Sequence, residues 1–214
     1  MYRSKKAKLI KVLKKKYPEA KIALRFSNNF ELLVATMLSA QCTDRRVNIV
    51  TDSLFQKYRF LSDWANAKVE ILEQDIRSVG FFRNKAKNII AVAIMLRDKF
   101  KGHIPENMAD LVSLPGIARK SANVILYNAF SKNEGIAVDT HVRRLAQRLG
   151  LTQNNNPVKI EKDLMDLFVR RDWGAINHLL IAHGREICIS RKPRCKECVI
   201  NKYCEYWKNS RNEE

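Results

Sequence analysis

The sequence predicts an all-α protein. Apolar residues recur at helical spacing along most of the 214-residue chain, and runs that alternate apolar and polar residues, as half-buried strands do, are nearly absent. Glycines and prolines fall between the periodic segments, where helices are expected to stop or start. With 46% hydrophobic residues, the chain can bury a sizeable core in one domain or in two compact lobes.

The first clear helix is expected around residues 30–38. Its apolar residues recur at i, i+3, i+4, i+7 and i+8, which leaves one face that can pack inward. Asn28 and Glu31 at its start fit a capping box. Two further helical stretches are expected from about Asp44 to Tyr58 and from the region of Trp64 to about Ile76.

A longer helix is expected from Arg83 to Phe100. Gly80 and Gly102 lie at positions where helices should stop. Pro105 fits the first turn of a short helix that reaches Leu111.

Residues 114–122, LPGIARKSA, predict a tight hairpin between two helices. Gly116 supplies backbone freedom and Ala122 allows the helices to approach closely. Amides that point outward at the start of the second helix, together with the helix dipole, can bind a phosphate. Gly116, Ile117 and Ala118 would contribute their backbone to such a site. A Pro-Gly turn by itself also fits a simple connector.

Lys120 is expected in the first turn of the second helix of this hairpin. Arg119 and the helix dipole disfavour a second positive charge there. A neutral amine beside a nucleic-acid backbone is a candidate nucleophile for Schiff-base chemistry. The position alone also fits an ordinary surface lysine.

Asp139 lies just before a helix expected over residues 142–149. Its simplest role is that of an N-cap. A carboxylate held at a helix start can also act as a base or stabilise positive charge on a sugar. Farther along, the segment 154–157, NNNP, predicts a loop that leads into another helix.

Four of the five cysteines lie near the C-terminus with the spacing C-x6-C-x2-C-x5-C; they are Cys188, Cys195, Cys198 and Cys204. This compact set fits four thiolates around one metal centre. Zinc sites of this kind usually have two C-x2-C pairs, whereas this chain has one, so an iron-sulfur cluster competes well with zinc. Disulfides would need an oxidising compartment. Because neither a signal peptide nor a membrane span is evident, we expect a reduced, intracellular protein, in the cytoplasm or nucleoid if prokaryotic.

The chain is strongly basic, with 40 Lys and Arg against 22 Asp and Glu and a net charge of +18. A polyanionic partner is the natural inference. Nucleic acid is favoured over an anionic membrane, because the basic residues are spread along the chain and do not gather in one amphipathic segment. A generally cationic surface without a specific partner is the alternative.

Taken together, the hairpin with Lys120, the segment around Asp139 and the cysteine tail resemble endonuclease III, within the helix-hairpin-helix DNA glycosylase superfamily. The resemblance implies two helical lobes that flank a DNA-binding cleft. A six-helix barrel lobe with the hairpin would span residues 22–132, and a 4Fe-4S cluster lobe would combine residues 1–21 with 133–214. A monomer is expected on the same ground.

The resemblance also implies an activity. The enzyme would remove oxidised pyrimidines from duplex DNA and nick the strand 3′ to the abasic site by β-elimination. Lys120 would form the Schiff base, Asp139 would assist, and the four cysteines would bind the cluster. A ferredoxin-like carrier or redox sensor, and a lesion-binding module without chemistry, are the competing classes. Neither the size of the helical domain nor the pair Lys120 and Asp139 fits a dedicated carrier.

Further segments match DNA-facing elements of the family. Gln41 stands where the family fills the gap left by the flipped nucleotide, with Asp44 nearby, and Phe81 stands where a leucine often wedges against the opposite strand. Ala118 replaces a common second glycine, which is harmless at negative φ and strained at positive φ. The loop between Cys188 and Cys195 is expected to turn three basic residues towards DNA phosphates; they are Arg191, Lys192 and Arg194.

Overall fold

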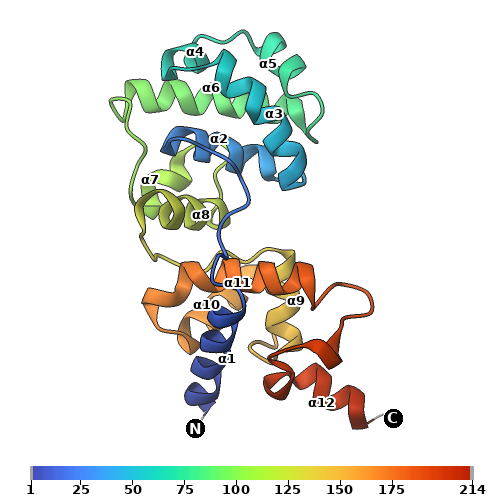
Figure 1. Cartoon of the computed structure of the whole chain (residues 1–214). Coiled ribbons are helices and arrows are strands. Elements are labelled where there is room, and N and C mark those ends of the chain that lie inside the picture. The colour runs from blue at the N-terminus through green and yellow to red at the C-terminus, as the bar shows by residue number, and fades with distance from the viewer. Residues whose placement is uncertain (1, 213–214) are drawn as a thin grey trace. The chain divides into compact units, whose positions relative to one another are not determined.

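A computed structural model describes the backbone of residues 2–212 and the side chains of residues 8–210. Over these residues all regular structure is helical, which confirms the all-α prediction (Figure 1). The chain divides into two compact units: Ala23–Lys132, here called the hairpin unit, and Met1–Ile22 with Asn133–Glu214, the cysteine unit. No helix in the described part of the chain is long and apolar enough to cross a membrane.

The hairpin unit is built around one buried helix, α2. Seven consecutive residues of this helix, from Leu32 to Leu38, are buried, so it is surrounded on all sides. It packs against α3, α6 and α8. The helices of this unit are α2 (Asn29–Ser39), α3 (Asp44–Lys57), α4 (Leu61–Ala65), α5 (Val69–Asp75), α6 (Phe82–Asp98), α7 (Met108–Ser113) and α8 (Arg119–Phe130).

The start of α2 follows the predicted capping. The Asn28 side chain accepts the Glu31 amide at 2.9 Å, while the Glu31 carboxylate accepts the amide of Ser27 at 2.6 Å. The reciprocal bond of the box therefore reaches one residue farther back than expected, and two amides at the helix entrance are satisfied.

Three predictions in this unit are wrong in detail. The stretch from Trp64 to Ile76 is two helices, because the helical path is broken at residues 66–68: the Ala67 amide bonds back only three residues, to the Trp64 carbonyl at 3.3 Å, and α5 starts after its N-cap Lys68. Pro105 precedes α7, whose N-cap is Asn107. Gly80 belongs to the turn before α6 and does not end a helix, since α5 stops at Asp75.

The cysteine unit joins the two ends of the chain in one core. Leu9 and Leu13 of α1 are fully buried, and their helix packs on α11 and η3. The α11 residues Ile176 and Leu180 are fully buried in the same core, together with Ile200 from the tail. The elements of this unit are α1 (Tyr2–Lys16), α9 (Thr140–Arg148), α10 (Pro157–Leu167), η1 (Arg170–Asp172), α11 (Trp173–Glu186), η2 (Cys195–Glu197), η3 (Asn201–Tyr203) and α12 (Glu205–Asn212).

The start of α10 is as the sequence predicts. Pro157 is its first residue, and the Asn156 side chain caps it by accepting the amides of Val158 at 2.9 Å and Lys159 at 3.3 Å. Proline is suited to this position because its missing N–H would have no partner inside the helix.

Candidate nucleic-acid interface and cysteine centre

The hairpin joins α7 to α8 in a turn that needs glycine at one position. Gly116 has φ +78°, a conformation that L side chains rarely adopt. A Cβ at Gly116 would lie 2.7 Å from the side-chain nitrogen of Asn88 on α6. Leu114 and Ile117, which lie on either side of this turn, are buried and anchor it to the core.

The backbone after Gly116 shows which amides could face a ligand. Ala118 has φ −92°, so the residue that replaces a common glycine is unstrained. It makes no side-chain cap to α8, and the first amides of a helix have no partner within that helix. The Ile117 amide donates to the Leu114 carbonyl at 3.1 Å and is therefore already engaged in the turn.

Lys120 is the second residue of α8 and its side chain is exposed. It lies two residues after Ala118, so the amine projects from the same helix start that lacks a side-chain cap. A primary amine at this place is open to solvent. The Gly116 turn and Lys120 are therefore neighbours in the chain, at the start of α8.

Asp139 is the N-cap of α9 in the cysteine unit. Its Oδ1 accepts the Val142 amide at 2.7 Å, which confirms the cap prediction. The bond fixes the orientation of a half-buried carboxylate.

Gln41 and Phe81 occupy two turns of the hairpin unit. Both have left-handed backbone conformations, with φ 54° and 57°, although neither is glycine. Both side chains are exposed, that of Phe81 to 63%. Asp44 is half-buried at the start of α3, next to the N-cap Thr43, whose hydroxyl accepts the Arg46 amide at 3.3 Å.

The four tail cysteines line one small pocket of the cysteine unit. Its other walls are largely apolar and include Leu149 and Trp207. Burial raises the pKa of the three thiols that follow the loop, and that of Cys198 reaches about 11; the three are Cys195, Cys198 and Cys204. Thiols in such surroundings stay protonated unless a cation compensates the thiolate charge.

The pocket gathers all four predicted cysteine ligands in one place. Among the side chains of residues 8–210, no group of three or more Cys, His, Asp or Glu is arranged as a site for a single metal ion. Four thiolates are a donor set that suits either a zinc ion or an iron-sulfur cluster.

Two residues at this pocket were not predicted from the sequence. Arg148 donates to the Cys188 sulfur at 3.3 Å and to the carbonyls of Ile189 and Ser190 at 2.8 Å. His183, which is buried, lies 3.3 Å from the Cys198 sulfur. Burial is the main cause that lowers the pKa of His183 to about 4. Neither residue has a spacing relative to the cysteines that would reveal its contact.

All three basic residues of the loop between Cys188 and Cys195 are exposed: Arg191, Lys192 and Arg194. Arg194 donates to the Glu186 carbonyl at 2.6 Å and pairs with Glu197 at 3.7 Å. Its guanidinium therefore braces the loop.

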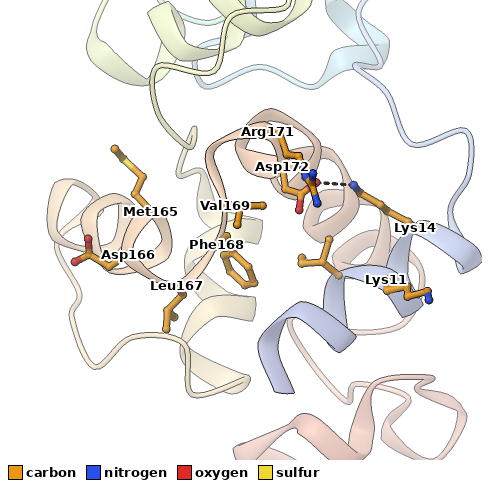
Figure 2. Close-up of a pocket in the computed structure, with 10 residues that line it drawn as sticks. Lys11, Lys14, Met165, Asp166, Leu167, Phe168, Val169, Arg171 and Asp172 are labelled. Atoms are coloured by element: carbon orange, nitrogen blue, oxygen red, sulfur yellow. Dashed lines mark hydrogen bonds and ion pairs between the residues drawn. The ribbon is translucent and has the colours of Figure 1, made fainter. Parts of the chain in front are cut away.

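A wide groove between α1 and residues 165–172 lies elsewhere in the cysteine unit (Figure 2). At its edge Lys14 pairs with Asp172 at 2.6 Å. None of the predicted site residues lines this groove.

The helical hairpin, the exposed lysine and the cysteine pocket define a protein of the class that binds nucleic acid through a helix-hairpin-helix turn. Residues 34–170 match the family model of the HhH-GPD superfamily base excision DNA repair protein. Endonuclease III of Synechocystis sp. is 48% identical over 92% of this chain and 90% of its own length. Endonuclease III of Bacillus subtilis is 45% identical over 88% and 86%.

Comparison with solved structures leads to the same family. A non-covalent endonuclease III–DNA complex superposes with a TM-score of 0.92, with 40% identity over 99% of both chains. A thermostable thymine-DNA glycosylase shares the fold, with a TM-score of 0.85 and 20% identity over 96% of this chain and 98% of its own. The chain belongs to the endonuclease III family of the HhH-GPD superfamily.

Proposed function

We propose that this chain is a bifunctional glycosylase and lyase that removes oxidised pyrimidines from duplex DNA and then cleaves the strand 3′ to the abasic site. The observation that carries the proposal is the exposed Lys120 in the first turn of α8, directly after the Gly116 turn. Flipping the damaged base out of the stack costs a few kcal/mol, and less where the lesion has weakened stacking. A DNA substrate of this kind places the enzyme inside the cell.

In this mechanism the Lys120 amine attacks the sugar C1′, the C1′–N bond to the base breaks, and the lysine nitrogen gives up a proton. The base leaves with the bonding electrons and takes up a proton. The O4′–C1′ bond then breaks as O4′ is protonated, which opens the ring to a Schiff base. A proton is lost from C2′ and the C3′–O bond breaks, which releases the 3′ strand with its 5′-phosphate. Water then hydrolyses the imine and restores the amine.

Asp139 assists the displacement step. Its carboxylate, held by the Val142 amide, can take a proton from the lysine or stabilise positive charge on the sugar. The cap bond keeps the carboxylate in one orientation, which favours either role. Gln41 would fill the gap left by the flipped nucleotide, Phe81 would wedge against the opposite strand and Asp44 would lie beside them.

The four cysteines are suited to a 4Fe-4S cluster as a structural brace. Their donor set is four thiols in an apolar pocket, and Arg148 supplies a cation beside Cys188. When bound, the cluster would hold the loop that carries Arg191 and Lys192. These two residues are proposed to contact phosphates, with Gly116 and Ala118 of the hairpin supplying backbone contacts. Iron and sulfide analysis of the purified protein tests the assignment.

The nucleophile is tested by borohydride trapping on duplex DNA with one thymine glycol. The wild-type protein should give a covalent adduct, and Lys120→Ala should give none. Lys68→Ala, which removes an exposed lysine of the same unit, is the matched control and should trap normally. An adduct that persists in Lys120→Ala would assign the nucleophile elsewhere, and base release without any adduct would indicate a monofunctional glycosylase.

A further inference from the structure

The turns that carry Gln41 and Phe81 are strained and must be held by their surroundings. A non-glycine residue in the left-handed region costs on the order of 1–3 kcal/mol, and such residues persist only where neighbouring contacts fix them. Both side chains are exposed, so burial of these side chains does not offset the strain. Other contacts must therefore hold the two turns.

The two turns lie against each other. A Cβ added to Gly80, the residue before Phe81, would lie 3.5 Å from the carbonyl oxygen of Gln41. Even the smallest side chain at Gly80 would therefore touch the backbone of Gln41, so the two turns are neighbours although they are far apart in the sequence.

The Lys85 side chain joins the first turn of α6, which follows Phe81, to the end of α2, which precedes Gln41. Its ammonium donates to the carbonyls of Leu38 at 2.8 Å and Ala40 at 2.7 Å, at the end of α2 just before Gln41. The Lys85 backbone amide makes the regular helical bond to the Phe81 carbonyl at 3.1 Å, so the residue stands one turn after Phe81. The last carbonyls of a helix have no partner within it, and a cation near them is favourable.

The burial of Lys85 is unusual for its type. The residue is only 7% exposed, whereas lysine is almost never buried unless it is paired. An amine buried here must be desolvated, and the carbonyls of Leu38 and Ala40 compensate for the lost water. Lys87 on the same helix is exposed, so it provides a control for the loss of a lysine from α6.

We propose that Lys85 is a positioning residue: by joining the end of α2 to the start of α6, it holds Gln41 and Phe81 in the conformations that act on DNA. The inference rests on the proposed function, since it takes these two side chains to be DNA-facing. It predicts that Lys85 affects base excision through Gln41 and has little effect on steps that need no base to be flipped.

The test is a double-mutant cycle with Lys85→Met, Gln41→Ala and the double variant, with Lys87→Met as the control. Single-turnover excision of thymine glycol and cleavage of a preformed abasic site are both measured. Lys85→Met should slow excision about tenfold in the wild-type background and less than about threefold when Gln41 is already alanine. Cleavage of the abasic site should change less, and Lys87→Met should change neither.

Equal losses in both backgrounds, or equal losses in excision and abasic-site cleavage, would overturn the proposal and leave Lys85 as general support for the fold. If Lys85→Met does not fold, the same cycle is run with Lys85→Arg, which keeps a charged donor but displaces it. Absence of excision and of any adduct in the wild-type protein is a different result: it removes the proposed function, and this inference with it.

Discussion

Gly116→Ala is expected to destabilise the hairpin unit by about 2–3 kcal/mol, the sum of a backbone and a steric contribution. The alanine would have to adopt φ +78°, which costs roughly 1–2 kcal/mol for an L residue. Its Cβ would also come 2.7 Å from the Asn88 side-chain nitrogen, so that side chain must move off its rotamer for about another 1 kcal/mol. Because the same turn bears the proposed phosphate site, DNA affinity should fall as well.

Urea unfolding measured beside a matched glycine variant checks this magnitude. Gly80→Ala is the control, because its Cβ would meet the Gln41 carbonyl at an ordinary 3.5 Å. Adding Asn88→Ala to Gly116→Ala should recover the steric part of the loss and leave the backbone part. Equal unfolding midpoints for Gly116→Ala and Gly80→Ala would refute the reasoning.

Four further outcomes are expected. Asp139→Asn should keep the α9 cap, whereas Asp139→Ala should lose about 1 kcal/mol of unfolding free energy; slow excision by a fully stable Asn variant would show that the charge is needed. Arg148→Met should yield protein with less iron than Arg143→Met, an exposed control on the same helix, and equal iron contents would contradict the role of Arg148 as the cation beside Cys188. Removing Arg191 and Lys192 together should reduce the slope of log affinity against log salt by roughly 1.8, and an unchanged slope would exclude both as phosphate contacts. Burial lowers the pKa of His178, so His178 binds a proton more readily in the unfolded chain than in the folded one. The free energy of unfolding should therefore fall as the pH drops below about 6.5. His178→Gln should flatten this pH dependence, and parallel stability curves for the two proteins would contradict the expectation.

Local chemistry made several elements predictable. Asn28 and Asn156 cap the helices that their sequence positions indicate, and Asp139 caps α9. These contacts span two or three residues, so the sequence contains all the partners. The single helix expected from Trp64 to Ile76 is interrupted at residues 66–68, where the Ala67 amide bonds to the Trp64 carbonyl in a turn, and helical periodicity does not reveal this break.

The supporting residues of the candidate sites were not predictable in the same way. Lys85 lies 45 residues from Ala40, and Arg148 lies 40 residues from Cys188. In the sequence each is one basic residue among 40. Their roles come from carbonyls and sulfurs that approach only when distant helices pack together.

The sequence by itself determined the helical class, the local caps, the glycine at the hairpin and the spacing of the tail cysteines, because each depends on neighbouring residues. Tertiary structure decided which basic side chains are buried against backbone carbonyls and which stay exposed. The physical reason is that desolvation and hydrogen-bond partners are properties of a position in the packed fold. Lys85 and Lys87, two residues apart on α6, have the same chemistry and opposite environments.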